Sequence, residues 1–274
     1  MSAVAKIQAR KLSKIFGDPP RAVHALDAID LEVFDNEFVT LVGASGCGKS
    51  TLLRIIGGLD YHTSGEIAVS GKPVQGPGAD RAMVFQHYSL YPWLSVMQNI
   101  KFCRRLKAGR SNLTSADVEA ASGRADALLN VMGLPKVADA WPNQLSGGMQ
   151  QRVAIARALM TRPEVLLMDE PFGALDTQTR EVMHDLILHV FNLERATIVF
   201  VTHDVEEAIY LGQRVVVMAP HPGRIDSIYA VPLPARRTQD MKHTAEFLAL
   251  KRAIVARIRE TSGMKTDLEM LERL

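Results

Sequence analysis

The sequence Gly43-Ala44-Ser45-Gly46-Cys47-Gly48-Lys49-Ser50-Thr51 carries the strongest structural signal in this chain. It follows the apolar run 38–42, which is typical of a buried parallel strand, and it leads into the helical pattern 52–56. A strand, a glycine-rich loop and a helix in this order match the phosphate-binding pattern G-x-x-x-x-G-K-[ST]. The segment therefore predicts a nucleotide-binding site at the end of the strand.

The residue types of this loop explain why it would bind phosphate. Glycines let the backbone turn its N–H groups toward phosphate oxygens, and the helix behind adds the positive end of its dipole. We expect Lys49 to reach the β- and γ-phosphates and the Ser50 hydroxyl to hold Mg²⁺. The alternative is a glycine turn with an incidental lysine, which the flanking strand and helix disfavour.

Length and composition limit the class of protein. The 274 residues are enough for a large buried core, and 32 Lys+Arg against 30 Asp+Glu leave a net charge of only +2. That balance argues against a nucleic-acid partner.

No apolar run approaches the roughly 18–20 residues that cross a membrane, and residues 1–10 lack a signal-peptide core. We therefore expect a soluble, cytosolic chain without a disulfide framework or zinc site, because its cysteines, Cys47 and Cys103, have no C-x-x-C spacing.

Hydrophobic patterning along the rest of the chain predicts an α/β fold. Strands are expected at 7–14, 23–34, 65–71, 81–85, 165–168 and 196–201, and a hairpin at 214–218 and 224–231. Helices are expected at 95–106, 114–133, from Ser146 onward, 176–193, 205–211 and 243–261. The first three of these helices would form a helical block between strands.

The last predicted helix, 243–261, is amphipathic. Its apolar stripe consists of Phe247, Leu250, Ile254 and Ile258. The basic residues on the other side are expected to face solvent, and the alternative is a membrane-surface or regulatory contact. These residues are Lys251, Arg252, Arg257 and Arg259.

Two acids end the predicted strand Leu166-Leu167-Met168-Asp169-Glu170. In a phosphate-loop enzyme an acid at such a strand end completes Mg²⁺ coordination, a role we assign to Asp169. Glu170 would then face the γ-phosphate, where a carboxylate can polarise the attacking water. A solvated strand end is the alternative, and the loop at Gly43 makes it the weaker interpretation.

Two further polar side chains end predicted strands. His203 follows the strand 197–202, and Gln86 follows the strand 81–85. Because parallel sheets bind ligands at their carboxyl ends, His203 could bridge the γ-phosphate and Glu170. The Gln86 amide could bind Mg²⁺ or orient water. A lone histidine is more often structural, but strand ends carrying Lys49, Gln86, Asp169, Glu170 and His203 together favour a reaction site.

A second loop, Leu145-Ser146-Gly147-Gly148-Met149-Gln150-Gln151-Arg152, opens a helix. Ser146 is a suitable N-cap, and Gly147-Gly148 expose backbone N–H groups at a positive helix end. The residues alone leave two possibilities open, a second anion site or a well-capped helix.

This set of motifs, in this order across roughly residues 7–232, resembles the nucleotide-binding subunit of an ABC transporter. The resemblance implies that residues 43–51 form the Walker A loop, Asp169 is the Walker B acid and Glu170 the catalytic base. It further implies that Gln86 is the Mg²⁺ and coupling glutamine and His203 the switch histidine. In the same way, Asp176 looks like the acid that crosses to a partner subunit, and Phe16 takes the place of the aromatic residue that stacks on adenine.

The resemblance also implies an architecture and an assembly. The expected fold is a P-loop NTPase core, a parallel sheet with helices, plus an antiparallel β subdomain and an inserted helical signature subdomain. We expect a cassette over 1–240, its helical part at about 90–162, and a C-terminal helical extension over 241–274. In this family ATP and Mg²⁺ lie between the Walker A loop of one subunit and Ser146, Gly147 and Gly148 of a second, so a homodimer is expected. Closure on ATP and reopening after hydrolysis would supply a mechanical stroke.

Two shorter segments, Tyr91-Pro92-Trp93-Leu94-Ser95-Val96-Met97-Gln98-Asn99-Ile100 and Ala219-Pro220-His221-Pro222-Gly223-Arg224-Ile225, are similar to the importer branch for nitrate, sulfonate and taurine. That branch also serves bicarbonate and small nitrogenous nutrients. The resemblance implies an ATPase at the cytoplasmic face of the membrane that contacts a separate permease through the Gln86–Trp93 region. An extracytoplasmic solute-binding protein would be an indirect partner. For Tyr91-Pro92-Trp93 the alternative to a permease contact is ordinary packing. For the whole chain the alternatives are a soluble ABC ATPase acting on DNA or ribosomes and an exporter subunit.

Overall fold

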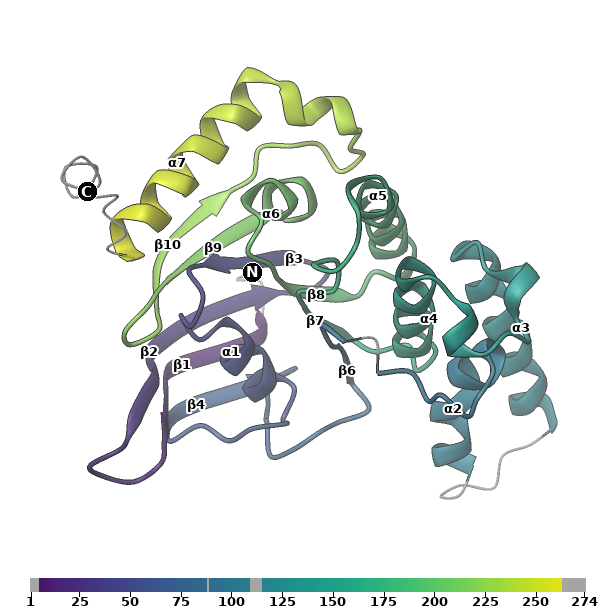
Figure 1. Cartoon of the computed structure of the whole chain (residues 1–274). Helices are drawn as coiled ribbons and strands as arrows, with labels where there is room; N and C mark the ends of the chain where they lie inside the picture. Colours follow the sequence, from purple (N-terminus) through teal and green to yellow (C-terminus); the bar gives the residue numbers. More distant parts are fainter. Residues whose placement is uncertain (1–4, 88, 109–114, 263–274) are drawn as a thin grey trace, which may run out of the picture.

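The computed structural model describes residues 5–87, 89–108 and 115–262, with the side chains of 103–121 left out (Figure 1). The prediction that Cys103 takes part in no disulfide or zinc site concerns a side chain outside the described ones. The larger of two sheets has the strand order β10-β9-β3-β8-β7-β6. Its strands are β3 (Phe38–Gly43), β6 (Arg81–Val84), β7 (Val165–Asp169), β8 (Thr197–Val201), β9 (Arg214–Ala219) and β10 (Arg224–Ala230).

Strands β9, β3, β8, β7 and β6 run parallel, and β10 pairs antiparallel with β9 as the predicted hairpin. Their alternate side chains enter two separate hydrophobic cores. On β7, Leu166 and Met168 lie in one core, while Val165 and Leu167 lie in the other. A parallel sheet covered on both faces needs apolar residues on both sides, which explains the continuous apolar runs in the sequence. The predicted α/β phosphate-loop core is thus confirmed.

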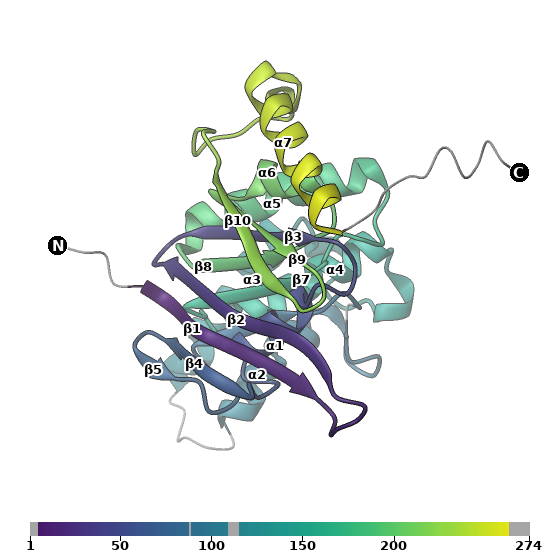
Figure 2. The same ribbon diagram turned by 90° about the vertical axis from the view of Figure 1, so that its left-hand side faces the viewer.

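The smaller sheet has the order β2-β1-β4-β5 and is antiparallel (Figure 2). Its strands are β1 (Ala5–Phe16), β2 (Val23–Phe34), β4 (Ser64–Val69) and β5 (Lys72–Pro73). It shares one core with the lower face of the large sheet and with α1 (Lys49–Ile56). The strand predicted at 7–14 was too short, because β1 continues to Phe16, which pairs with Val23. Register shifts along the β1–β2 pair break the period-two alternation that marks a strand.

Three helices, α2 (Val96–Ala108), α3 (Ser115–Val131) and α4 (Gly147–Leu159), lie together beside β6 and β7, on the right of Figure 1. This is the predicted helical block, and the short 3₁₀ helices Pro135–Val137 and Pro142–Gln144 lead into α4. Helices α5 (Thr177–Glu194) and α6 (Val205–Leu211) cover the sheet face opposite α1 (Figure 1). Within the described ranges, no helix combines the length and apolar character needed to cross a bilayer.

The 3₁₀ helix Gln239–His243 and α7 (Ala245–Ser262) follow β10. The predicted apolar stripe is confirmed, because Phe247 and Ile254 are buried in the core above the sheet. Whether a separate extension begins near residue 241 stays a prediction.

The basic face predicted to be solvated also carries ion pairs at two of its four residues, whose side chains are 36% and 42% exposed. Lys251 Nζ lies 2.6 Å from Glu206 Oε2 on α6, and Arg257 makes two contacts of 2.6 and 2.7 Å with Asp226 on β10. The acidic partners come from elements distant in sequence, so periodicity within the helix could not reveal them. Arg252 and Arg259 are exposed, as expected.

Candidate functional site

The predicted site residues from four strands follow the carboxyl ends of one parallel sheet. The phosphate loop follows β3, Gln86 follows β6, Asp169 ends β7, and His203 comes two residues after β8. Strand β8 lies between β3 and β7, so it brings His203 between the loop and Glu170. Ligands of open α/β sheets bind at this edge.

Lys49 is the first residue of α1 and is 7% exposed. Its ammonium donates hydrogen bonds to the carbonyl oxygens of Gly43 at 2.9 Å and Ala44 at 3.1 Å. A buried ammonium needs such partners, because an unpaired charge away from water is costly. The contacts fold the loop around the lysine, with Ser45 and Gly46 exposed at its tip and Thr51 half-buried.

Gly48 caps α1 with φ of 90°, in the left-handed region that side chains disfavour. A Cβ atom at this position would also lie 2.5 Å from Leu26 Cδ2 and 2.9 Å from the Ala25 carbonyl oxygen. The glycine is therefore required both by the turn and by the close approach of β2. Cys47 was expected to bind nucleotide as part of the 43–51 loop. Its thiol is fully buried in the core, so only its backbone is available to a ligand.

The Ser50 hydroxyl donates a hydrogen bond of 2.7 Å to Asp169 Oδ1, which joins the phosphate loop to the end of β7. Burial raises the pKa of the Asp169 carboxyl above its ordinary value, although the Ser50 hydrogen bond opposes this shift. The Ser50 hydroxyl and the Asp169 carboxylate thus lie side by side, and oxygen atoms of these types are the ligands that Mg²⁺ prefers. The donor set thus fits the expected metal.

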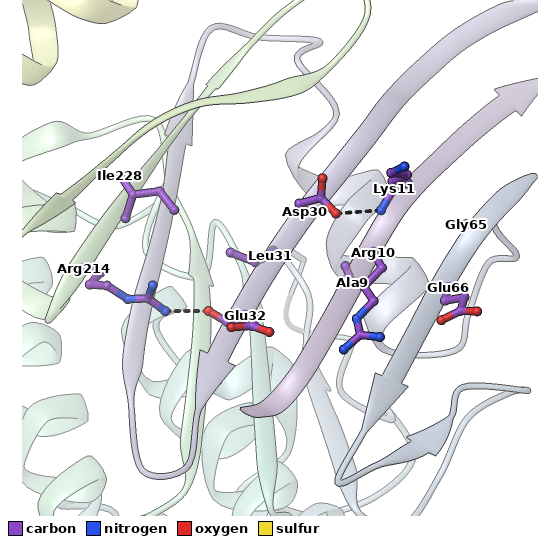
Figure 3. Close-up of a pocket in the computed structure, with 10 residues that line it drawn as sticks. All are labelled: Ala9, Arg10, Lys11, Asp30, Leu31, Glu32, Gly65, Glu66, Arg214 and Ile228. Carbon is purple, nitrogen blue, oxygen red and sulfur yellow. Dashed lines mark hydrogen bonds between the residues drawn. The ribbon is translucent and has the colours of Figure 1, made fainter. Parts of the chain in front are cut away.

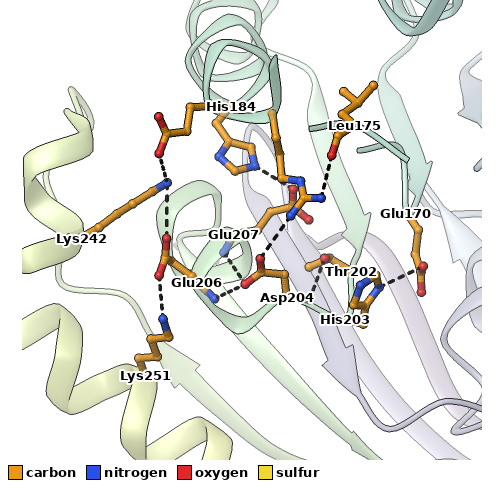
Figure 4. A network of polar contacts seen from close by, with 12 residues as sticks. Glu170, Leu175, His184, Thr202, His203, Asp204, Glu206, Glu207, Lys242 and Lys251 are labelled. Carbon is orange, nitrogen blue, oxygen red and sulfur yellow. Dashed lines mark hydrogen bonds and ion pairs between the residues drawn. The ribbon is translucent and has the colours of Figure 1, made fainter. Parts of the chain in front are cut away.

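Glu170 follows Asp169 with φ of 44°, a left-handed conformation that is unusual for a residue other than glycine. Its N–H donates to the Val201 carbonyl oxygen of β8 at 2.9 Å, which holds this turn in place. Its Oε2 lies 3.1 Å from His203 Nδ1 (Figure 4). The His203 side chain is 64% exposed and that of Glu170 is 23% exposed, so a ligand that enters from solvent can contact both. Strained backbone of this kind occurs at functional sites.

Phe16 and Gln86 are both accessible. Phe16 is 39% exposed, and the Lys14 ammonium lies 4.5 Å from the centre of its ring. Lys14 is held in turn by Asp60 Oδ1 at 2.7 Å and by the Tyr61 carbonyl oxygen at 2.6 Å. The cation occupies one position over the ring and fixes its orientation. Gln86 is exposed two residues after the end of β6.

Ser146 and Asp176 are exposed N-caps of two helices. The Ser146 hydroxyl accepts a hydrogen bond from the Met149 N–H at 3.3 Å, and Asp176 Oδ1 accepts one from the Thr179 N–H at 3.0 Å. The hydrogen bonds from Thr179 lower the pKa of Asp176. In the described part of the chain neither side chain hydrogen-bonds to the 43–51 loop.

Two residues of this region were missed by the sequence interpretation. Arg180 Nη2 donates to the Leu175 carbonyl oxygen at 2.9 Å, and its Nη1 lies 3.8 Å from Asp204 Oδ2. Asp204 also caps α6 through Oδ1, which accepts from the Glu206 N–H at 2.8 Å. The signal available for Asp204 was its place directly before an apolar helical run. No local pattern pointed to Arg180.

A separate open groove of about 770 Å³ crosses the smaller sheet beside β10 (Figure 3). Its charged lining residues are of both signs, and several are paired with each other. Asp30 Oδ1 accepts from the Lys11 N–H at 2.9 Å, and Arg214 donates to the Glu32 carbonyl oxygen at 2.6 Å. None of the predicted site residues lines this groove, so the phosphate-loop edge remains the candidate site.

A phosphate loop after β3, an acid at the end of β7 and a histidine after the intervening strand β8 are the features of a phosphate-loop ATPase. Residues 26–173 match the family model described as ABC transporter. The chain is 46% identical to the nitrate import ATP-binding protein of Synechocystis sp., over 93% of this chain and 96% of the relative. It is 40% identical to the aliphatic sulfonates import ATP-binding protein of Bacillus subtilis, over 92% and 94%.

Among solved structures, the dimeric post-hydrolysis state of the ATP-binding cassette MJ0796 bound to ADP and Pi matches with a TM-score of 0.71 and 32% identity. The match covers 83% of this chain and 100% of that chain. The chain described here belongs to the ABC transporter family, and it is an ATP-hydrolysing cassette.

Proposed function

We propose that this chain is the subunit that powers import of a small solute through a separate membrane permease, and that the residues at the sheet edge hydrolyse ATP. The main support for ATP hydrolysis at this edge is the contact of 3.1 Å between Glu170 and His203. The hydrogen bond that joins Ser50 and Asp169 involves the residue adjacent to Glu170. Together these contacts assemble an acid–base pair beside a phosphate-binding loop.

Each residue then has a defined task. Lys49 exchanges its bonds to Gly43 and Ala44 for the β- and γ-phosphates. Ser50 and Asp169, with Gln86, would hold Mg²⁺, which supplies electrostatic stabilisation of phosphate charge. Glu170 accepts a proton from the attacking water, and His203 orients Glu170 and contacts the γ-phosphate.

The exposed positions of Ser146 and Asp176 support a two-subunit site. Both side chains are exposed at helix starts, where backbone N–H groups attract phosphate. We propose that Ser146, Gly147 and Gly148 complete the ATP site of an identical partner and that Asp176 crosses the interface. Phe16 stacks on the adenine ring.

The Gln86–Trp93 region is proposed to receive a cytoplasmic helix of the permease. Trp93 is 66% exposed, and its ring centre lies 5.5 Å from that of Tyr91. The loop is held rigid by Asn99, fully buried, whose side chain donates to the carbonyl oxygens of Tyr91, Leu94 and Ser95. An exposed aromatic residue on a fixed loop is a typical interface anchor.

The names of the relatives support import of a small oxyanion of the nitrate or sulfonate kind, with the chain at the cytoplasmic membrane face and a solute-binding protein as an indirect partner. The test is to copurify the tagged chain with its permease from native membranes, reconstitute the complex in vesicles, and measure nitrate and alkanesulfonate uptake with Mg-ATP inside. We expect ATP-dependent uptake by the wild type and none by Lys49→Ala. Efflux would instead assign the chain to an exporter. Association with ribosomes or DNA only would refute transport while leaving ATP hydrolysis in place.

A further inference from the structure

The first turn of α5 contacts α4, the helix that Ser146 caps. It also contacts Asp176, the residue just before α5. A Cβ atom at Gly148 of α4 would lie 2.5 Å from Thr179 Cγ2, so these two residues are in direct contact. Thr179 also donates its N–H to the Asp176 cap, and Arg180 donates its N–H to the Asp176 carbonyl oxygen at 2.9 Å. Ser146 and Asp176 are thus both connected to this turn, Ser146 through its helix and Asp176 directly.

Arg180 extends from the same turn toward the other side of the site. Its guanidinium donates to the Leu175 carbonyl oxygen and faces Asp204 at 3.8 Å. The two terminal nitrogens serve different partners, which a planar guanidinium does with little loss of conformational freedom. The side chain is 29% exposed and that of Asp204 is 38% exposed, so this ion pair contributes little to stability. A functional role is the better explanation for its position.

Asp204 joins Arg180 to the segment that carries His203. Its Oδ1 caps α6 by accepting from the N–H groups of Glu206 and Glu207, while its Oδ2 faces Arg180. Its own N–H donates to Thr202 Oγ1 at 3.0 Å. His203 lies between these two fixed points, and Figure 4 shows it reaching from there to Glu170.

A buried contact joins α5 to α6. His184 Nε2 of α5 lies 2.7 Å from Glu207 Oε1 of α6, and these side chains are only 3% and 5% exposed. The ring of His184 also packs between Phe172 and Tyr210. Helix α6 thus has two attachments to α5, one at its cap and one inside its first turn (Figure 4).

We propose that Arg180 is a positioning residue that couples the partner's ATP site to the chain's own His203. Contact of Ser146 and Asp176 with the partner's nucleotide shifts the first turn of α5, and Arg180 passes this shift to Asp204 and His203. The inference rests on the proposed two-subunit site. It predicts that each ATP site senses whether the other is occupied.

The test compares three variants in the intact protein. Arg180→Ala removes both contacts, Arg180→Lys keeps the charge with a single donor group, and Asp204→Asn keeps an acceptor that caps α6 while removing the charge opposite Arg180. For each variant we would measure the ATP Kd, kcat, the Hill coefficient for ATP, and ATP-dependent dimerisation in a Glu170→Gln background.

We expect Arg180→Ala and Asp204→Asn to lower kcat by about tenfold, the effect of about 1.4 kcal/mol of lost transition-state stabilisation. The Hill coefficient for the ATP dependence of hydrolysis should fall toward the value set by dimerisation alone, because occupancy of one site no longer assists the reaction at the other. ATP Kd and dimerisation should stay within about twofold of the wild type. Arg180→Lys should recover part of kcat.

Arg257→Ala is the matched control, because it removes an arginine with two contacts to Asp226 that lies on α7. It should leave kcat and the Hill coefficient unchanged. Equal losses in Arg257→Ala, or unchanged kcat and cooperativity in Arg180→Ala, would overturn the inference. Loss of dimerisation would also overturn it, since Arg180 would then act on the interface. Wild-type protein that binds no ATP would refute the proposed function itself.

Discussion

His203 Nδ1 lies 3.1 Å from Glu170 Oε2 although the two residues follow different strands, β8 and β7. A backbone bond from the Glu170 N–H to the Val201 carbonyl oxygen sets this distance by joining the strand ends. The pair is accessible from solvent, so a nucleotide at the phosphate loop can reach both side chains. Their separate roles can be distinguished by mutation.

Glu170→Gln should retain ATP binding and lose hydrolysis. The amide is nearly the same size but cannot accept the proton of the attacking water, so kcat should fall by a factor on the order of 10²–10⁴. Because ATP is not consumed, the variant should accumulate as an ATP-bound dimer in light scattering. A monomer at saturating ATP would contradict the two-subunit site.

His203→Ala should lower kcat on the order of 10²-fold, since it removes one group aimed at developing phosphate charge. The ATP Kd should change little, because Lys49 and the loop remain. His189→Ala, an exposed histidine on α5, is the matched control and should retain full activity. A raised ATP Kd with an unchanged kcat would assign His203 to binding alone.

Asp169→Asn should raise the Tm of the nucleotide-free protein at neutral pH while abolishing Mg-ATP hydrolysis. Burial raises the folded-state pKa of Asp169, so the ionised form destabilises the fold at any pH above that pKa. The carboxyl becomes neutral as pH falls through the raised pKa, and the Tm advantage of the amide should then shrink. Calorimetry over a pH series tests this, and a Tm difference that grows on acidification would contradict it.

Phe16→Ala should weaken ATP binding by about 1–3 kcal/mol, the usual loss for one aromatic–base stack. Binding of inorganic tripolyphosphate should be unaffected, because it has no base, and Phe16→Tyr should keep the affinity for ATP. Titration calorimetry with both ligands separates these effects. If tripolyphosphate affinity falls equally, Phe16 acts on the loop and does not contact adenine.

Trp93→Ala should leave the ATPase activity of the isolated chain unchanged and weaken permease binding by about 2 kcal/mol or more, as expected for an exposed aromatic anchor. Trp141→Ala offers a control, since Trp141 is the other tryptophan and is 45% exposed. Copurification from membranes and vesicle uptake provide the readout. Equal losses in both variants would remove the proposed specificity of the Gln86–Trp93 region.

Short-range patterns predicted the sheet and the residues at its carboxyl edge. Lys49, Asp169, Glu170 and His203 each follow an apolar run, and parallel strands necessarily bring such ends to one edge. The helices were equally clear because their caps, including Ser146 and Asp176, precede periodic segments.

Contacts between distant elements could not be predicted in this way. Lys14 holds Phe16 in place, Arg180 faces Asp204, and Arg257 pairs with Asp226, yet none of these residues has a local signal for its partner. Cys47 shows the related limit, because a position within a binding loop does not reveal which way the side chain points.

Lys49 donates hydrogen bonds to the carbonyl oxygens of Gly43 and Ala44, so the chain itself holds the loop together. The entropic cost of ordering the loop is then borne by folding and not by nucleotide binding. The affinity lost in Lys49→Ala therefore contains two free energies, one for the missing phosphate contact and one for a loop that must be organised on binding.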